Sequence, residues 1–500
     1  MKVRQVVNEG RLLVVVEEDS LARGELQRQK IHCDIGVGGR RGRVEAADAS
    51  TTKVFDITTY GAKGDDKTDC TMAFMKAWKD SCKNDGPAKI RVPKGTFMTA
   101  PITFQGPCKS TKPIIVEVQG TVKGTNDLSK YTEDTWFLFE KINGVVLTGG
   151  GTFDGQGSSV WKNTDCEKKK DCGRLPTSIK FQGVTNAVVS EITSINSKHF
   201  HFHITDCTNF KASNLNIVAS GESPNTDGMH ISDTNGVVVT NSKIGTGDDC
   251  ISIGQGVTNA AISKIFCGPG HGLSIGSLGK YKNEADVKDV TISDCTLFNT
   301  TNGLRIKTWA DSPPSAASSI TFKDIIMKSV KNPIIIDQKY GSRSSTKPSR
   351  VKISNVHYNN IRGTSTSKVA VNFLCSPSVP CEKIELDDVD LTYTGIKKSK
   401  SPISASCVNA KTVNGMASFL AYILSRDYAW RWLFGCFDSG IQAVLSFLVL
   451  CSMIVDNAGL DGMILKGDAG IGSAVVSWAW FSMEISLLDL VTSCPFGLSM

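Results

Sequence analysis

A short strand pattern that returns every 23 to 26 residues is the feature that most constrains the fold of this chain. Each copy opens with an Asn and continues into a short apolar strand, at 186–189, 209–212, 235–239 and 259–262. A polar turn and a second short strand follow, such as Met229-His230-Ile231 or Ile251-Ser252-Ile253. Strands this short cannot bury a face alone, but stacked coils can share one interior, so the period indicates a solenoid.

Later copies of the pattern begin near Asp289, Ser319, Arg350 and Lys383, at intervals of about 30 to 33 residues with longer loops between them. Helical periodicity is nearly absent from this part of the chain. We therefore predict an all-β fold, a right-handed single-stranded parallel β-helix.

The first coils are less regular and include one helical segment. Residues 70–83 carry apolar side chains at Met72, Phe74, Met75, Ala77 and Trp78, which is compatible with an amphipathic helix. The open end of a solenoid exposes its core and unpaired strand edges, so we expect this helix to cap the N-terminal end. Strands near 90–92, 114–116 and 145–147 are expected to begin the regular coils.

The two ends of the chain differ from the repeat. We expect residues 1–53 to be an atypical extension outside the fold, 54–410 to be the β-helix domain, and 411–500 to be an atypical hydrophobic tail. The early apolar run 12–16 is followed at once by acidic residues, so no ordinary signal peptide is recognised there. The tail has two apolar runs, 441–455 and 469–483, which are shorter than the roughly 20 residues that cross a bilayer. Membrane contact is expected only if this tail inserts.

The net charge and the motifs of the chain limit the kinds of partner and cofactor that it can be expected to bind. The formal net charge is +7, which is compatible with an anionic partner but does not choose among anionic polymers. There is no zinc-type Cys/His spacing, no phosphate-binding Gly loop and no basic patch interleaved with aromatic residues. We therefore predict no metal, no organic cofactor and no nucleic-acid partner.

The cysteine content indicates an oxidising compartment. The chain has 16 cysteines, and close pairs occur at Cys166/Cys172, Cys250/Cys267 and Cys375/Cys381, although buried free thiols would also account for them. Asn299-Thr300-Thr301 is a candidate N-glycosylation site. Both features favour secretion.

Four polar islands interrupt the apolar repeat and suggest its chemistry: Asn225-Thr226-Asp227, Gly247-Asp248-Asp249-Cys250, Gly270-His271-Gly272 and Arg305-Ile306-Lys307. Three carboxylates, an imidazole and two cations are the groups that hydrolysis of an acidic polysaccharide requires. Their spacing is close to the repeat period, so the side chains can stack on one face of the solenoid. An isolated turn, a packed histidine or solvated strand charges would account for any single island, but the four together favour a site.

The expected geometry matches glycoside hydrolysis. Adjacent coils lie about 4.7–4.9 Å apart, and an inverting pair of carboxyl groups lies roughly 6.5–9.5 Å apart with a water between. Asp227 and Asp248 on neighbouring coils could meet that requirement. Adjacent aspartates on a regular strand would face opposite ways, so we expect the backbone to bend, with Gly247 supplying the conformational freedom. Crowding of three carboxylates should raise the pKa of at least one of them.

In this order and spacing, the islands resemble those of the polygalacturonases of glycoside hydrolase family 28. The phrases at 245–254 and 267–279 are similar to the plant branch, especially to pollen-type exopolygalacturonases, and the resemblance extends from roughly 54 to 407. It implies an inverting hydrolysis of the α-1,4-galacturonosidic bonds of polygalacturonate. The implied catalytic residues are Asp248 as general acid, Asp227 and Asp249 as the water-holding and basic pair, and His271, which tunes the acid. The implied substrate-binding residues are Asn225, Arg305, Lys307 and Tyr340.

Other functions stay open on these residues. A pectate lyase shares the fold but needs a calcium-binding acidic cluster and a basic residue that abstracts a proton. An endo-polygalacturonase, a rhamnogalacturonan hydrolase and an inactive pectin-binding solenoid are further alternatives. The resemblance alone favours exo action with release of galacturonate. It also implies a secreted protein of the cell wall with pectin as its partner, and we expect a monomer.

Overall fold

The computed structural model describes residues 2–8, 11–17, 52–163, 175–341, 346–395 and 403–412. The chain divides into two units, Met1–Ala49 and Ser50–Met500. In the first unit, β1 (Lys2–Asn8) pairs antiparallel with β2 (Arg11–Glu17). The predicted hydrophobic tail beyond Thr412 and the predicted pair Cys166/Cys172 lie outside the described residues.

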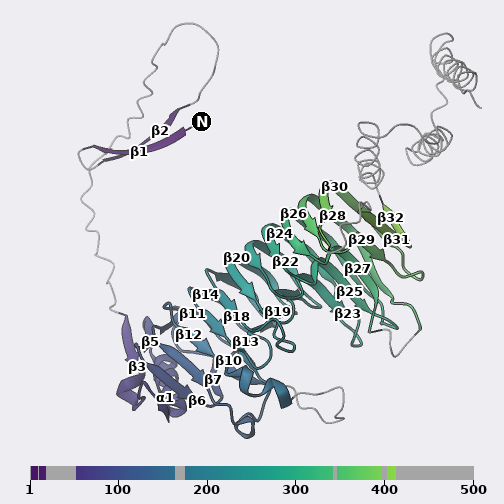
Figure 1. Cartoon of the computed structure of the whole chain (residues 1–500). Helices are drawn as coiled ribbons and strands as arrows, with labels where there is room; N and C mark the ends of the chain where they lie inside the picture. Colours follow the sequence, from purple (N-terminus) through teal and green to yellow (C-terminus); the bar gives the residue numbers. More distant parts are fainter. Residues whose placement is uncertain are drawn as a thin grey trace, which may run out of the picture. The chain divides into compact units, whose positions relative to one another are not determined.

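In the second unit, parallel strands stack as successive coils of a β-helix (Figure 1). Among the described residues, they form one 11-stranded and one 19-stranded sheet. The 11-stranded sheet contains β7 (Ile102–Gln105), β10 (Thr135–Glu140), β13 (Thr177–Gln182), β16 (Phe202–Thr205), β19 (Met229–Ser232), β21 (Ile251–Ile253), β23 (Leu273–Leu278), β25 (Asn302–Trp309), β27 (Asn332–Tyr340), β29 (Val369–Leu374) and β31 (Ser404–Val408). The predicted parallel β-helix is confirmed.

The 19-stranded sheet holds the other sides of the coils. Its strands are β3 (Lys53–Asp56), β4 (Asp65–Asp69), β5 (Ala88–Val92), β6 (Thr96–Thr99), β8 (Ile114–Val118), β9 (Thr121–Gly124), β11 (Asn143–Thr148), β12 (Thr152–Asp154), β14 (Thr185–Ser190), β15 (Thr193–Ile195), β17 (Thr208–Ser213), β18 (Asn216–Val218), β20 (Asn235–Gly245), β22 (Thr258–Cys267), β24 (Val287–Phe298), β26 (Ser315–Val330), β28 (Val351–Ser365), β30 (Cys381–Tyr393) and β32 (Ala410–Thr412). Short 3-10 helices are η1 (Ile57–Tyr60), η2 (Leu128–Lys130), η3 (Gly157–Ser159) and η4 (Trp161–Asn163).

The interior is built from rows of apolar side chains that repeat from coil to coil. One row consists of Ile231, Ile253, Ile275, Ile306 and Ile336, which pair in register along the 11-stranded sheet. All five are fully buried. Burial of such a side chain contributes about 1.5–3 kcal/mol, so this register is strongly preferred over a slip by one residue, which would turn the row toward solvent.

A column of left-handed backbone residues produces one of the bends in each coil. Asn186, Asn209 and Asn259 all have positive φ, and each lies one residue before the strand positions that pair from coil to coil. Asn adopts this conformation more readily than most residues because its short side chain bonds locally. The Asn209 side chain donates to Asn186 Oδ1 at 3.1 Å, so the bends are also tied to one another.

The same column corrects two predicted coil boundaries. The residue that aligns with Asn209 on the next coil is Gly236, not Asn235, and the later bend falls at Asn355, not at Arg350. Both Gly236 and Asn355 have positive φ. The repeat is thus defined by a backbone conformation, which several residue types can adopt, rather than by an Asn.

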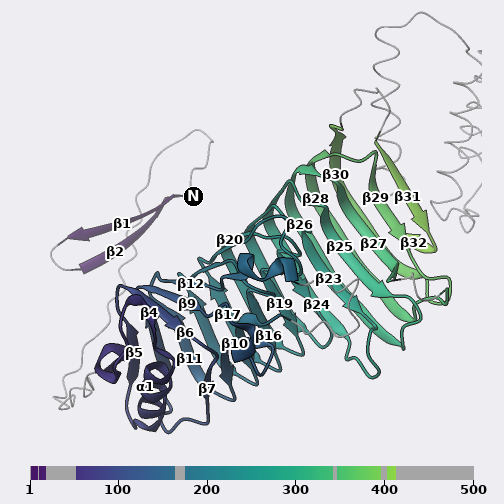
Figure 2. The same cartoon turned by 60° about the horizontal axis from the view of Figure 1, so that its bottom comes forward.

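A helix covers the N-terminal end of the stack, as predicted. Figure 2 shows α1 (Thr71–Lys83) beside β5 and β7. Phe74, Ala77 and Trp78 are buried, and the Trp78 indole stacks on Phe104 with 4.6 Å between ring centroids. Met72, which was predicted to belong to the apolar face, is 63% exposed. Within the described residues, no helix is both long and apolar enough to span a membrane.

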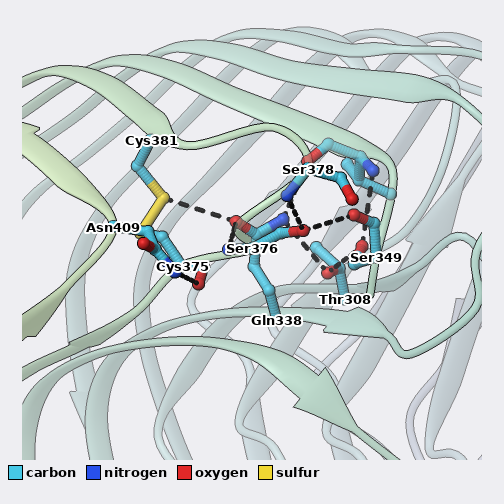
Figure 3. The surroundings of a disulfide bond; sticks show 9 residues. Thr308, Gln338, Ser349, Cys375, Ser376, Ser378, Cys381 and Asn409 are labelled. Carbon is cyan, nitrogen blue, oxygen red and sulfur yellow. Dashed lines mark hydrogen bonds between the residues drawn. A yellow bond between two sulfur atoms is a disulfide. The ribbon is translucent and has the colours of Figure 1, made fainter. Parts of the chain in front are cut away.

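Three disulfides join described residues. Cys250–Cys267 and Cys375–Cys381 confirm the predicted pairs. The third, Cys82–Cys108, was not predicted, because its 26-residue separation is bridged only when α1 packs beside the next coil. Figure 3 shows Cys375–Cys381 beside a buried polar network.

Gln338 is the centre of that network. Its side chain donates to Val351 O at 2.8 Å and accepts from Ser376 N at 3.0 Å. Cys381 Sγ lies 3.4 Å from the same Gln338 oxygen (Figure 3). Gln338 is 1% exposed and lies two residues before Tyr340 on β27. The network therefore joins strand β27 to the disulfide-bonded loop.

Replacing Gln338 by Leu is expected to lower the free energy of unfolding by about 1–3 kcal/mol, because the buried Ser376 N–H and Val351 C=O would lose their partner. The midpoint of urea-induced unfolding measures the effect. Lys339→Gln, at the exposed neighbouring position on the same strand, is the matched control and should leave the midpoint in place. Equal midpoints for both variants would contradict the structural role of the amide.

Candidate active site

The predicted catalytic residues lie on three adjacent coils of the 11-stranded sheet. Met229, Ile251 and Leu273 are register partners at the start of β19, β21 and β23. Asp227, Asp249 and His271 each stand two residues before these positions. Backbone bonds tie the turns together, since Gly228 N donates to Asp249 O and His271 N donates to Asp248 O at 2.8 Å. The solenoid thus brings together residues that are 22 to 44 positions apart.

The backbone bends at Gly247 and Asp248 before β21 begins. The predicted bend is present, but the predicted reason for Gly247 is wrong. Gly247 does not have a left-handed φ; instead, a Cβ there would lie 1.9 Å from Ser223 O on the preceding coil. Gly247 is required because two backbones approach closely at this point, which only a residue without a Cβ permits.

Asp249 is the fully buried centre of a charge cluster. Its Oδ1 accepts from Arg305 Nη2 at 2.6 Å and from Ser274 Oγ at 2.7 Å. Its Oδ2 accepts from Lys307 Nζ at 2.8 Å. The carboxylate side chain is 0% exposed. Arg305 and Lys307 therefore share one strand face, as predicted.

This cluster fixes the charge of Asp249. Burial by itself would raise the pKa of the carboxyl, but the positive charges of Lys307 and Arg305 outweigh it and lower the pKa to about 2. Burial likewise opposes the charge of Lys307, and the Asp249 carboxylate reverses this and raises the pKa of the ammonium. Asp249 is therefore ionised at neutral and mildly acidic pH.

Asp227 is in the opposite environment. It is buried, and its Oδ2 accepts from Ser252 Oγ at 2.7 Å. Burial, followed by repulsion from Asp248 and Asp249, raises the pKa of Asp227 well above its ordinary range. One of the three pKa values is thus raised, as expected, but burial contributes more to the rise than the predicted crowding does.

Asp248 is the aspartate of the three that solvent reaches most readily. Its side chain is 19% exposed, and that of His271 is 39% exposed. His271 Nδ1 lies 2.8 Å from Asp248 Oδ1, which also accepts from Asp249 N at 2.8 Å. In the part of the chain that the structure describes, no partner reaches Asp248 Oδ2. That oxygen is thus available to a bound molecule.

Asp248, Asp249 and His271 also offer ligand atoms that lie within 4.8 Å of one another. Carboxylate and imidazole groups at this distance could hold a cation. Arg305 and Lys307, however, already neutralise Asp249 and would repel a further positive charge. The donor set therefore favours ion pairing within the protein.

The remaining predicted residues are Tyr340, Asn225 and Asn299. Tyr340 lies beneath Lys307, with 5.2 Å from Nζ to the ring centroid. Asn225 has positive φ in an exposed turn, and its Nδ2 is 3.3 Å from His199 Nε2. Asn299 is exposed just after β24, so its glycosylation stays a prediction.

Three residues beside the aspartates were not predicted. Ser252 donates to Asp227 and Ser274 donates to Asp249, and His230 Nδ1 lies 2.8 Å from Ser252 Oγ. Both serines occupy the same position of an apolar-Ser-Ile triplet, at 251–253 and 273–275. That repeated polar residue inside a buried strand was the signal that could have identified them.

The chain is similar in sequence to known proteins. Residues 82–416 match the profile of glycosyl hydrolases family 28. An exopolygalacturonase of Arabidopsis thaliana is 48% identical over 385 residues, which cover 76% of this chain and 89% of the relative. An exopolygalacturonase of Platanus acerifolia is 44% identical over 365 residues, which cover 72% of this chain and 95% of the relative.

Solved structures resemble the fold at lower identity. An endo-xylogalacturonan hydrolase from Aspergillus tubingensis superimposes with a TM-score of 0.62 at 24% identity, over 73% of this chain and 99% of that protein. A hyperthermoactive exopolygalacturonase from Thermotoga maritima gives a TM-score of 0.55 at 20% identity, over 68% of this chain and 88% of that protein. These two likenesses concern the β-helix alone.

Proposed function

This chain belongs to glycosyl hydrolase family 28, and on that premise we propose that it hydrolyses the α-1,4-galacturonosidic bonds of polygalacturonate as an exopolygalacturonase. The relatives of 48% and 44% identity that carry this name support the exo assignment. The partner is then the pectin polysaccharide, and we infer that the protein acts as a monomer outside the cell. The three disulfides among the described residues support an oxidising compartment.

The observation that carries the proposal is the different state of three neighbouring carboxyl groups. Asp249 is held as an anion, Asp227 has a raised pKa, and Asp248 is partly exposed to solvent. Carboxyl groups whose environments separate their pKa values are the arrangement that acid–base cleavage of a glycosidic bond needs. The site therefore supports hydrolysis better than carbohydrate binding alone.

We assign the general acid to Asp248. Its Oδ2 carries the proton that passes to the leaving glycosidic oxygen, while Oδ1 stays anchored by the Asp249 N–H and by His271. His271 keeps the carboxyl group oriented and, being partly exposed, also reaches the sugar. The bond to the anomeric carbon breaks as the proton is transferred.

We assign the base to Asp227. A carboxylate with a raised pKa takes a proton from water more readily than one with a pKa of about 2, so Asp227 suits this role better than Asp249. Asp249 then acts as the fixed anion that positions Lys307 and Arg305. Attack by the water on the face opposite the leaving group inverts the anomeric configuration.

The two cations would bind the substrate carboxylate. Lys307 has three N–H donors and Arg305 has five, and Asp249 and Ser274 use only part of them. The remaining donors can bind the uronate next to the scissile bond, with Tyr340 and Asn225 lining the sugar. A neutral sugar would leave these buried cations without that partner, so the site favours galacturonate.

Early digests of polygalacturonate are expected to contain mainly monogalacturonate. Exo action removes one terminal sugar at a time, so short oligomers should not accumulate first. Chromatography of the products at less than a tenth of complete digestion, together with measurement of new reducing ends, checks this. A ladder of mixed oligomers would instead indicate endo action, an unsaturated product would indicate a lyase, and binding without turnover would indicate a pectin-binding solenoid.

A further inference from the structure

Two buried serines occupy equivalent places beside two of the aspartates. Ser252 and Ser274 are register partners on β21 and β23. Ser252 Oγ donates to Asp227 Oδ2 at 2.7 Å, and Ser274 Oγ donates to Asp249 Oδ1 at 2.7 Å. Each hydroxyl therefore serves an aspartate of the preceding coil through the same geometry.

The two serines differ in the group that donates to them. Arg305 Nε donates to Ser274 Oγ at 3.0 Å. The corresponding contact of Ser252 is His230 Nδ1, at 2.8 Å. A serine hydroxyl has one hydrogen, which Ser252 gives to Asp227, so the oxygen must accept from the imidazole. While Asp227 is ionised, His230 therefore carries its proton on Nδ1.

We propose that Ser252 and His230 are positioning residues that hold Asp227 in the orientation needed to take a proton from the attacking water. This inference rests on the proposed hydrolysis. Ser252 donates a hydrogen bond to Asp227 Oδ2, so Oδ1 is the oxygen that faces the water. His230 fixes the Ser252 hydroxyl so that its hydrogen points to the carboxylate and to no other acceptor.

The neutral imidazole matters as much as the hydrogen bond. Burial, and then the charge of Lys307, lowers the pKa of His230 to about 4, so the ring stays uncharged above that pH. The Phe200 ring stacks on it at 5.0 Å, and the His203 ring lies 5.2 Å away. A neutral donor orients Asp227 without stabilising its anion as strongly as a guanidinium would, so the carboxylate stays basic. At Asp249, by contrast, the charged Arg305 beside Ser274 stabilises the anion and lowers the pKa of the carboxyl group.

Several neighbouring groups affect the pKa values of Asp227 and His230. Asp248 and Asp249 raise its pKa, while Lys307 and the Ser252 hydrogen bond lower it. His199 and Asp249 act on His230 together with Lys307. If only Ser252 is changed, the other contributions stay in place and the effect of the hydroxyl can be isolated.

The central test is Ser252→Ala in the full chain. We expect kcat on polygalacturonate to fall about 10- to 100-fold through lost orientation, with KM within a factor of two. The acid limb of the kcat/KM profile should move to higher pH, because the lost hydrogen bond lowered the pKa of Asp227. His230→Asn, which keeps a donor near Nδ1, should retain more activity than His230→Leu. His357→Asn, on β28 of the 19-stranded sheet, is the matched control.

A second measurement does not depend on turnover. Nitrogen-15 chemical shifts of His230 should report a protonated Nδ1 and an unprotonated Nε2 in the unmutated chain, and this preference should weaken in Ser252→Ala. An Nε2-protonated ring, or an unchanged acid limb with equal loss in both His230 variants, would overturn the proposal. Absence of polygalacturonate turnover with the expected tautomer would instead refute the proposed function and leave the hydrogen-bond chain intact. Unfolding midpoints identify any variant that has lost the fold.

Discussion

Replacing Asp248 by Asn is expected to lower kcat on polygalacturonate by about 100- to 10,000-fold, the range that a general acid contributes, with KM little changed. Asn has the size of Asp and keeps an oxygen that can accept from Asp249 N and His271 Nδ1. It has no proton to give to the leaving oxygen. Initial rates of reducing-end release over a range of substrate concentrations separate kcat from KM. Asp294→Asn, an exposed carboxylate on the 19-stranded sheet, is the control.

The leaving group provides a sharper test of which aspartate is the acid. A galacturonide with an acidic phenol as leaving group needs little protonation, so Asp248→Asn should lose much less activity on it than on the polymer. Asp227→Asn should lose activity equally on both substrates, because a base acts on the water and not on the leaving oxygen. The opposite pattern would exchange the two roles.

Replacing Asp249 by Asn is expected to destabilise the fold by about 3–5 kcal/mol, because it leaves Lys307 and Arg305 buried without their counter-charge. The double variant Asp249→Asn/Lys307→Met removes one charge of each sign and should recover a large part of this loss, although neither protein would be active. Urea-induced unfolding midpoints of the single and double variants measure the coupling. Equal midpoints for the two would show that the ion pair is not what holds the site together.

The same cluster sets a pH dependence of stability. The folded-state pKa of Asp249 is about 2, below its ordinary value of about 3.9. An acid with a lowered folded-state pKa contributes stability that is complete above the unfolded-state pKa and is lost as the pH falls through the folded one. Unfolding midpoints of the unmutated chain should therefore decline between about pH 4 and pH 2. Asp249→Asn should show less of this decline.

The repeat could be predicted from the sequence because each coil of the β-helix needs a nearly fixed number of residues. Alternating apolar residues returned at nearly constant intervals, and buried rows such as Ile231, Ile253 and Ile275 follow directly from that alternation. The alignment at Asn235 was one residue off, because the bend needs a left-handed conformation that Gly236 also provides. The residue types identified the length of the repeat, but the backbone dihedral angles defined the position at which each coil turns.

The site could be predicted in part, for a related reason. Four polar islands at one coil spacing must lie on neighbouring coils, so the meeting of Asp227, Asp249 and His271 was foreseeable from the sequence. Ser252 was missed because its contact with Asp227, 25 residues earlier, depends on how β21 aligns with the turn before β19. A slip of one residue would have directed that hydroxyl elsewhere.

Residue types and their intervals were thus sufficient for the coil architecture, the family resemblance and the set of charged groups at the site. They were insufficient for the opposite pKa shifts of Asp227 and Asp249. A pKa responds to burial and to charges a few ångströms away in space, and those neighbours come from other coils: Lys307 and Arg305 around Asp249, but Ser252 and a neutral His230 beside Asp227. The packing of one coil on the next therefore determines the pKa values of Asp249 and Asp227.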